Sequence, residues 1–388
     1  MTERERFIDA YMRREDTVAE LSRRFGISRK TGYKWIARYM AGTELTDRSR
    51  RPHRSPNAVA QDMEDFIVAA RKVHTRWGPQ KLREALVRAN PGVVFPSAGT
   101  FALIFTRNGL VRPRRKRRLR TPPSTQPFGH ITGPNSLWCV DFKGDFDVGQ
   151  RRCYPLTITD AYSRYLICCV GLSGTRSGPV RKVFERVFRE FGMPEAIRSD
   201  NGSPFASNAP RGLSRLSAWW AQLGIRHERI TPGKPQQNGR HERMHLTLKQ
   251  ETAMPPQRTM RSQQRAFDHF RKEYNVDRPH AALGQRVPAD YYQPSTRAAP
   301  EPIWGKDFQY DPDFATSRLD RLGRLRWAQW RVKISDALAN ALVGLKWCSA
   351  RRWDVYFGPH LVGAMEHPNS HSKRTVFIPV ASAVGRSG

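Results

Sequence analysis

Apolar residues at the start of the chain recur with the period of helices. They predict three short helices, over residues 3–13, 18–24 and 29–39. Thr17 and Glu20 form a capping box at the start of the second helix, Gly26 follows its end, and Ser28 is a candidate N-cap for the third. This order is that of a helix-turn-helix, with its tight turn at the glycine.

The third helix has one apolar face and one basic face. Trp35, Ile36 and Tyr39 are its predicted core, and its outward residues are Arg29, Lys30, Thr31, Tyr33 and Lys34. The last helix of a helix-turn-helix enters the major groove with its N-terminal end, so these outward residues are candidate DNA contacts. A three-helix bundle with a solvated basic face is the alternative.

A second helical unit follows a polar linker. Its helices are predicted at 60–73, 78–89 and 97–108, and two tandem units would read a longer DNA site than one.

Residues 112–120 then hold seven basic side chains out of nine. Such a run cannot pack as core and is typical of an arm on phosphates or of a solvated tether. Its candidate phosphate contacts are Arg114, Arg115, Lys116, Arg117 and Arg118.

From about residue 135 the pattern changes to strands that alternate with helices. Strands are predicted at 136–143, 152–159, 165–171, 195–199 and 225–230, and helices at 176–191, 213–223, 239–251 and 259–274. Three successive strands followed by alternating units predict a mixed sheet.

The stretch 315–380 is predicted to be all-β, and its 11 Lys+Arg against four acids favour a small basic barrel on nucleic acid.

The predicted fold class is multidomain: an all-α tandem helix-turn-helix N-terminus, an α/β core with a mixed sheet and a small all-β SH3-like barrel. The predicted regions are a helix-turn-helix domain (1–43), a linker (44–57), a second helix-turn-helix domain (58–111), a basic linker (112–130), the core (131–293), a linker (294–314) and the barrel (315–380).

Composition narrows the choice of partner. The formal net charge of +32 favours nucleic acid, because phosphates neutralised by Lys and Arg release condensed counterions. The most apolar stretch, 165–172, is too short to span a membrane, and the first residues lack the pattern of a secretory signal. The cysteines have no C-x-x-C spacing, so we expect buried packing residues at Cys139, Cys153, Cys168, Cys169 and Cys348.

Three acidic residues are candidates for metal-dependent chemistry. Asp141 interrupts an otherwise apolar strand, where a carboxylate is costly to bury, although a hydrogen-bonded structural acid is the alternative. Asp200 ends a strand at the carboxyl edge of the sheet, and Glu242 follows a Gly/Pro/Asn-rich loop into a helix; each alone is a weak signal. Together they supply the oxygen ligands that two Mg²⁺ or Mn²⁺ ions need for phosphoryl transfer.

Two further residues bear on this set. Lys249 lies seven residues after Glu242, nearly two helical turns, so both project from one helix face. A cation there would hold DNA phosphate, and a solvated helix face is the alternative. Asp160 is a competing acid, which we assign to the hairpin between the second and third strands of the core.

The motifs around these acids resemble a known family. They are Trp138-x-x-Asp141-Phe-Lys-Gly, Arg198-Ser-Asp200-Asn-Gly and Pro235-Gln-x-Asn238-Gly-x-x-Glu242-Arg243, with Lys249 further on. They are similar to the DDE motifs of insertion-sequence transposases, whose catalytic core is similar to that of retroviral integrases. Segment 270–292 also resembles the end of that core. The resemblance covers roughly 135–292 closely and most of 1–111 loosely.

The resemblance implies an RNase H-like core in which Asp141, Asp200 and Glu242 are catalytic and hold two Mg²⁺ or Mn²⁺ ions. It implies water attack that frees a 3′-OH at the end of a mobile element, followed by attack of that hydroxyl on target DNA. Further implied DNA contacts are Asn238, Arg243 and Lys249. We expect a homo-oligomer on double-stranded element ends and target DNA, in the bacterial cytoplasm and nucleoid, with no membrane partner and no small-molecule substrate.

One departure from many relatives is the spacing of the last two acids. Between Asp200 and Glu242 lie 41 residues, and we attribute the extra length to a loop at 207–215. A transposase-derived DNA-binding protein without cleavage activity is the main alternative, against which the intact set of three acids argues. An RNase H-type hydrolase would share the metals but leaves the tandem helix-turn-helix units and basic tail unexplained.

Overall fold

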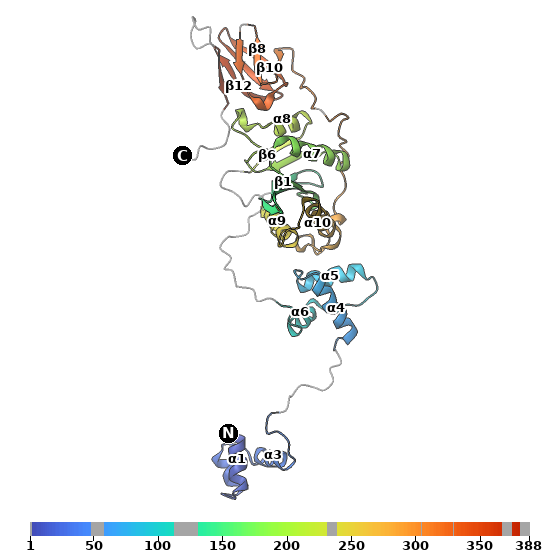
Figure 1. The fold of residues 1–388 in the computed structure, drawn as a ribbon, viewed down its shortest axis with the longest axis vertical. Coiled ribbons are helices and arrows are strands. Elements are labelled where there is room, and N and C mark those ends of the chain that lie inside the picture. The colour runs from blue at the N-terminus through green and yellow to red at the C-terminus, as the bar shows by residue number, and fades with distance from the viewer. Residues whose placement is uncertain are drawn as a thin grey trace. The chain divides into compact units, whose positions relative to one another are not determined.

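The computed structural model describes residues 2–47, 58–111, 131–230, 239–303, 305–328, 330–366 and 375–380. Contacts divide the chain into two units, Met1–Glu64 and Asp65–Gly388, and Figure 1 shows their elements. Among the described residues, no helix has both the length and the apolar character that crossing a membrane requires.

The first unit contains the three predicted helices, α1 (Glu3–Met12), α2 (Val18–Arg24) and α3 (Arg29–Met40). Their starts are fixed by side-chain caps. Thr2 and Thr17 form capping boxes with Glu5 and Glu20, and Ser28 caps α3 by accepting from a backbone N–H. The sequence signals for these helix starts therefore correspond to real hydrogen bonds.

The core of this unit is built around Phe7. Its ring packs edge-on against Phe25 and Trp35, with centroids 5.5 Å apart in both pairs. Ile36 is buried as predicted, but Tyr39 is 45% exposed, so its assignment to the core is wrong. The reason is helix length: α2 has seven residues and α3 twelve, so α2 cannot cover the last turn of α3.

Gly32 is a position where α3 approaches the other helices closely. A Cβ atom added there would stand 2.9 Å from Phe7 Cζ and from Ser22 Oγ. We expect Gly32→Val to destabilise this unit by roughly 1–3 kcal/mol, because overpacking displaces its neighbours. Amide hydrogen exchange in α1 and α3 measures the effect, with Ala37→Val on the exposed face of α3 as the control. Unchanged protection in Gly32→Val would contradict the close packing.

A second group of three helices matches the second predicted helical unit. They are α4 (Gln61–Val73), α5 (Pro79–Ala89) and α6 (Ala98–Arg107). Ile67, Trp77, Leu82, Phe101 and Phe105 are each at most 2% exposed and form its interior. All six helices expected before residue 111 are therefore present.

The central part of the chain is a mixed sheet, as predicted. Its strands are β1 (Trp138–Phe142), β2 (Phe146–Val148), β3 (Arg151–Asp160), β4 (Leu166–Leu172), β5 (Ala196–Ser199) and β6 (Arg226–Arg229). β3 pairs antiparallel with β1, β2 and β4, whereas β1, β5 and β6 run parallel. β2 was not predicted, because three residues are too few to show an alternating pattern.

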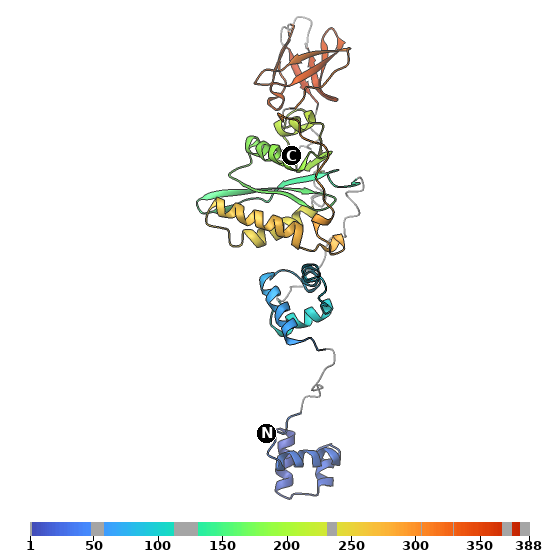
Figure 2. The same ribbon diagram turned by 90° about the vertical axis from the view of Figure 1, so that its right-hand side faces the viewer.

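Helices cover both faces of this sheet, as Figure 2 shows. On one side lie α7 (Ser177–Phe191) and α8 (Arg215–Gln222), and on the other α9 (Gly239–Thr252) and α10 (Met260–Lys272). Trp138, Phe184, Phe188 and Trp220 belong to the larger core, and Phe267 belongs to the smaller one under α10. The strands are therefore buried on both faces, which accounts for their nearly continuous apolar runs.

The outer edge of β4 is closed by side chains from the region of α10. Asn275 accepts from the N–H of Leu166 at 2.8 Å and donates to its carbonyl at 2.9 Å. Gln264 accepts from the N–H of Gly171 and donates to the carbonyl of Cys169, both at 3.0 Å. The two amides satisfy backbone groups that an exposed edge strand would offer to another chain.

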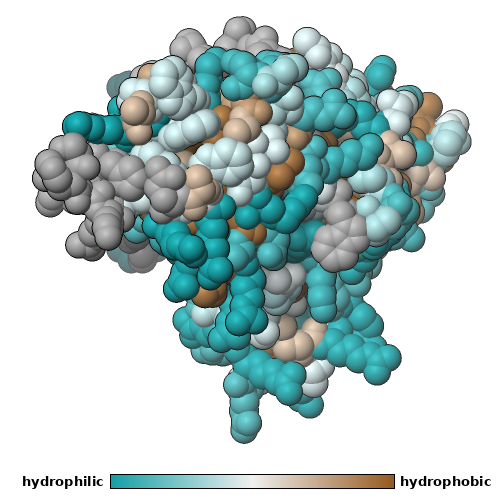
Figure 3. Space-filling view, turned by 90° about the horizontal axis from the view of Figure 1, so that it is seen from above, coloured by the Kyte–Doolittle hydropathy of each residue, from teal (hydrophilic) through white to brown (hydrophobic). Residues whose placement is uncertain are grey.

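The C-terminal part is all-β, as predicted. Its five-stranded antiparallel sheet has the order β13-β12-β11-β10-β7, beside a β8–β9 hairpin. The strands are β7 (Phe314–Arg318), β8 (Arg324–Trp327), β9 (Trp330–Lys333), β10 (Leu342–Ser349), β11 (Arg352–Phe357), β12 (His360–Glu366) and β13 (Val376–Pro379). In the end-on view of Figure 3, hydrophilic side chains cover most of the visible surface.

The loop at 207–215, to which we attributed the long acid spacing, contacts this β-domain. It contains the short helix η1 (Pro210–Gly212), and the N–H of Arg211 donates to the carbonyl of Val380. Ala218 of α8 belongs to the hydrophobic core of the β-domain. The inserted loop and α8 thus join the core to the C-terminal sheet.

The cysteines follow the sequence interpretation with one exception. Cys139, Cys153, Cys168 and Cys169 are buried, whereas Cys348 is exposed, so its assignment as a packing residue is wrong. Cys348 lies near the end of β10, past Lys346, the last residue of β10 that pairs with β7, and the last four residues of the strand are exposed.

Candidate active site

Asp141 and Asp200 come from neighbouring parallel strands. In the register of β1 and β5, Cys139 lies opposite Arg198, so two residues further along Asp141 falls opposite Asp200. Asp141 is the fourth residue of β1, and Asp200 directly follows β5. The strand pairing therefore brings both carboxylates to the carboxyl edge of the sheet, where ligands bind in open α/β folds.

Burial and acidic neighbours change the protonation of Asp141. Its side chain is 20% exposed. Burial and, to a smaller extent, the charges of Asp200 and Glu242 together raise the pKa of Asp141 to about 7, against the opposing effects of a backbone hydrogen bond from Phe142 and the charge of Lys143. Burial also raises the pKa of Asp200, although its carboxylate accepts from the N–H of Gly202 at 3.2 Å. The two acids are thus electrostatically coupled.

Glu242 lies in the first turn of α9 and is exposed. Its charge is felt at Asp141, so α9 brings this third acid towards the same edge of the sheet. Arg243 and Lys249 are exposed on the same helix. Asn238 lies outside the described residues, as do Arg114, Arg115, Lys116, Arg117 and Arg118 of the basic segment.

Within the part of the chain that the structure describes, no group of three or more His, Cys, Asp or Glu side chains is arranged to hold a metal ion. The chemistry of the three acids nevertheless fits a divalent cation. They offer only carboxylate oxygens, the ligands that Mg²⁺ and Mn²⁺ prefer. Burial and acidic neighbours raise the pKa of Asp141, and a bound cation would offset this cost.

The raised pKa predicts a pH dependence of stability. Between pH 3.8 and about 7 the folded protein keeps a proton on Asp141 that the unfolded chain has released, so this group weakens folding as the pH rises. In chelator, Asp141→Asn should therefore stabilise the protein more at pH 8 than at pH 5, by up to about 2 kcal/mol. Urea unfolding at both pH values measures the difference. An equal effect of the substitution at both would contradict the shift.

Two other acids have structural partners. Asp160 is 1% exposed and accepts from the backbone N–H groups of Asn135 and Ser163, both at 2.7 Å. It fixes the turn between β3 and β4, where the sequence analysis placed it. Glu228 on β6 accepts from Arg198 at 2.7 Å. Both acids serve the packing of the core.

The buried face of α9 carries two histidines that the sequence analysis missed. His241 and His245 are 3% and 6% exposed, and both contact Thr157 of β3. Burial lowers the pKa of His241 to about 3 and that of His245 to about 2, so both are neutral at physiological pH. The sequence contained a signal for them: His241 and His245 are four residues apart, so they lie on one face of the helix, and Glu242 stands between them in the sequence.

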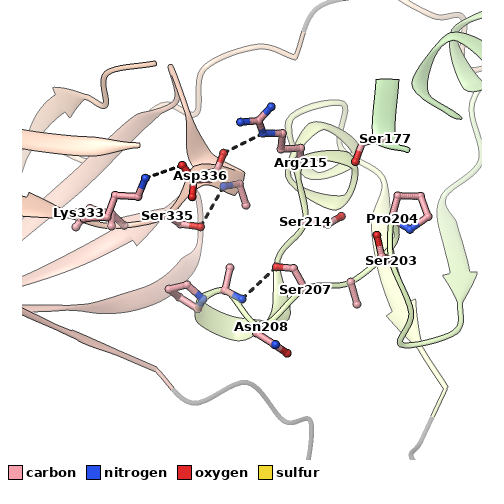
Figure 4. A pocket seen from close by; sticks show the side chains of 15 residues that line it. Ser177, Ser203, Pro204, Ser207, Asn208, Ser214, Arg215, Lys333, Ser335 and Asp336 are labelled. Atoms are coloured by element: carbon pink, nitrogen blue, oxygen red, sulfur yellow. Dashed lines mark hydrogen bonds and ion pairs between the residues drawn. The ribbon is translucent and has the colours of Figure 1, made fainter. Parts of the chain in front are cut away.

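A hydroxyl-rich pocket of about 490 Å³ lies beside the loop that follows Asp200 (Figure 4). The side chains around it include Ser177, Ser203, Ser207, Ser214, Arg215, Lys333, Ser335 and Asp336. Lys333 donates to the Asp336 carboxylate at 2.5 Å, and Arg215 donates to the Asp336 carbonyl at 3.2 Å. The pocket brings polar groups of the core and of the β-domain together.

The predicted DNA-reading side chains of α3 lie on its exposed side. Arg29, Lys30, Tyr33 and Lys34 are exposed. Thr31 is half-buried, and its backbone N–H donates to Ser28 Oγ at 3.2 Å. The N-terminal turn of α3 therefore presents cations and an aromatic ring to solvent, while its opposite face packs on Phe7.

Comparison with known families agrees with this architecture. Two profiles described as Integrase core domain match residues 131–235 and 223–288. A Helix-turn-helix domain profile matches residues 3–53, and a Homeodomain-like domain profile matches residues 31–104. The chain thus combines helix-turn-helix domains with an integrase core domain.

Curated relatives include proteins of insertion elements and viral polyproteins. A 39.2 kDa protein of insertion element IS476 from Xanthomonas euvesicatoria is 29% identical over 237 residues, which cover 61% of this chain and 66% of that protein. A 31.7 kDa protein of insertion element IS407 from Burkholderia multivorans is 27% identical over 59% of this chain and 82% of its own length. The Gag-Pol polyprotein of baboon endogenous virus is 31% identical over 30% of this chain and 6% of its own length. This combination of domains and homologues is consistent with an insertion-sequence transposase of the DDE and integrase type.

Two solved structures also match. One is the HTLV-2 integrase catalytic core domain in complex with magnesium, at 15% identity and a TM-score of 0.33, covering 42% of this chain and 98% of that one. The other is the simian T-cell lymphotropic virus intasome in complex with the PP2A regulatory subunit B56 gamma, at 16% identity and a TM-score of 0.38, covering 80% and 95%.

Proposed function

We propose that the chain is a DNA transposase of the integrase type. It binds the terminal inverted repeats of a mobile element, cleaves to free 3′-OH ends and joins these ends to target DNA. The observation that carries the proposal is the placement of Asp141 and Asp200 on neighbouring parallel strands, with the charge of Glu242 acting on Asp141. The integrase core and helix-turn-helix profiles support it.

Asp141, Asp200 and Glu242 would hold two Mg²⁺ or Mn²⁺ ions. Bound there, the ions would supply activation of the attacking oxygen and stabilisation of the leaving oxygen in a phosphoryl transfer. The chain itself contributes the spacing of the carboxylates, because β1 and β5 fix two of them and α9 fixes the third.

The proposed reaction has two steps. In the first, water attacks the phosphorus at the element end, and the bond from phosphorus to the 3′ oxygen breaks, so that the 3′ oxygen leaves as a hydroxyl. In the second, this hydroxyl attacks a phosphorus of target DNA and displaces a second 3′ oxygen. Lys249, which is exposed on the helix of Glu242, would bind a phosphate near the reacting one.

The DNA-binding surfaces are proposed to have separate tasks. Exposed Arg29, Lys30, Tyr33 and Lys34 of α3 would read bases in the repeats. The basic segment 112–120 and an SH3-like C-terminal domain would bind phosphates without regard to sequence. A homo-oligomer would hold two element ends together, since joining both ends needs two active sites.

The DNA on both sides of the gene tests this function. We expect matching inverted repeats there, and purified protein should bind them in preference to random DNA of equal length. Equal binding to repeats and random DNA would remove the proposed end recognition. Preferred binding without any cut strand in Mg²⁺ or Mn²⁺ would instead favour the DNA-binding protein without cleavage activity.

A further inference from the structure

We propose that Thr157 of β3 holds His241 and His245 of α9 as two hydrogen-bond donors, and that this network positions Glu242 and Asp141 for cleavage. The inference rests on the proposed function. Thr157, His241 and His245 are not catalytic residues here. They are positioning residues that act through the strand and the helix. The network is defined as Thr157, His241 and His245.

The network is centred on one hydroxyl. Thr157 is fully buried, and its Oγ1 lies 2.7 Å from Nε2 of His241 and 2.7 Å from Nε2 of His245. The same Oγ1 donates to the carbonyl oxygen of Asp141 at 3.1 Å. Thr157 is also the residue paired with Asp141 in the antiparallel register of β1 and β3. A single side chain therefore joins α9 to the backbone at Asp141.

The single proton of the hydroxyl limits how both histidines can bind it. A threonine hydroxyl has one proton and two acceptor lone pairs. We assign that proton to the carbonyl of Asp141, which can only accept, so that both imidazoles donate N–H to Oγ1 from Nε2. In this assignment each ring is the neutral tautomer with an unprotonated Nδ1, and the Nδ1 of His241 is then the acceptor for Thr159 Oγ1, 3.1 Å away.

This assignment has a consequence for Asp141. Nδ1 of His245 lies 3.9 Å from Oδ2 of Asp141, and in this tautomer it presents a lone pair and not an N–H to the carboxylate. His245 therefore forms no ion pair with Asp141. It sets the distance between the helix and the carboxylate without neutralising the negative charge that a divalent cation would need.

The network also fixes the helix that carries Glu242. Residues 241 and 245 are one turn apart on one face, and Glu242 follows the first of them directly. Apolar contacts of Met244 and Leu248 hold α9 against the sheet, but such contacts are not directional. Two hydrogen bonds to one fixed hydroxyl set the rotation and the register of α9, and hence the direction of Glu242.

Thr157→Val tests the positioning role, because it removes the hydroxyl and nearly keeps the shape. End cleavage should fall about 10- to 100-fold in kcat, the Mg²⁺ concentration for half-maximal rate should rise, and binding of end DNA should stay unchanged. Thr157→Ser keeps the hydroxyl and should restore most of the rate. His245→Gln, whose amide can still donate to Thr157, should be more active than His245→Leu.

Thr159→Val is the matched control. It removes a hydroxyl from the same strand two residues away, and that hydroxyl contacts His241 but does not bond to Asp141. Thr159→Val should destabilise the protein about as much as Thr157→Val does, but it should reduce the rate of end cleavage only a little. If the two variants cleave equally well, the inference is wrong while the proposed function stands. If the wild-type protein does not cleave, the proposed function and the positioning role both fail.

Histidine ¹⁵N NMR tests the network without using activity. Signals of the two residues are identified by their loss in His241→Gln and His245→Gln. Both rings should be neutral and protonated on Nε2 at pH 7, and Thr157→Val should shift both sets of signals. A proton on Nδ1 of either ring, or no response to Thr157→Val, would overturn the assignment.

Discussion

Asp141→Asn, Asp200→Asn and Glu242→Gln are each expected to abolish metal-dependent cleavage of element ends while leaving DNA binding intact. Each substitution replaces one carboxylate oxygen of a proposed metal ligand by an amide nitrogen, and it changes the shape of the side chain little. The loss should be about 10⁴-fold or more in rate, as for residues that act together at one reacting centre. Cleavage of labelled end DNA and gel-shift binding, measured on the same preparations, give the two readouts.

The control for this series is an acid outside the candidate site. Asp160→Asn is unsuitable, because Asp160 is buried and accepts two backbone N–H bonds, so an amide there would disturb the fold. Asp147 is 68% exposed and pairs with Arg152 at the surface, so Asp147→Asn should cleave as the wild type does. Full activity in any of the three site variants would remove that residue from the proposed set.

Replacing Arg29 and Lys30 together by Ala is expected to abolish the preference for element ends over random DNA. Both side chains are exposed in the first turn of α3, the part of a recognition helix that contacts base edges. Loss of each base-specific contact should cost roughly 1–3 kcal/mol of binding free energy. Competition binding with cognate and random duplexes at fixed salt measures the discrimination.

A double substitution on another helix separates charge from recognition. Arg6→Ala with Arg13→Ala removes the same number of charges from α1 and from its C-cap residue, both of which lie outside the predicted reading face. It should weaken binding to cognate and random DNA about equally. If Arg29→Ala with Lys30→Ala has the same uniform effect, or leaves the footprint unchanged, then α3 does not read the repeats.

Most of the fold could be predicted because local signals and tertiary structure agree. The capping pair Thr17 and Glu20 starts α2 at the predicted residue, and the apolar runs of β3 and β4 reflect burial on both faces. Tyr39 and Cys348 were assigned wrongly for one reason. Each lies near the end of an element, where the neighbouring element stops, and helical or strand periodicity says nothing about where a neighbour ends.

The candidate site was predictable only in part. Asp141 stands out because it interrupts an apolar strand and Asp200 because it directly follows one, and the pairing of β1 with β5 explains why both reach one edge. The network of Thr157, His241 and His245 could not be predicted from spacing alone. Two histidines four residues apart reveal a shared helix face, but only the register of β3 shows that one hydroxyl lies between them and Asp141.

A strand-joining assay tests the central claim most directly. A labelled duplex carrying one inverted repeat is incubated with the purified protein, a supercoiled plasmid and Mg²⁺ or Mn²⁺, and the covalent products are sequenced. The account predicts the 3′ end of the repeat joined to plasmid DNA, with no product in chelator or with Glu242→Gln. Specific binding of the repeat without any cleaved or joined strand in either metal would contradict it.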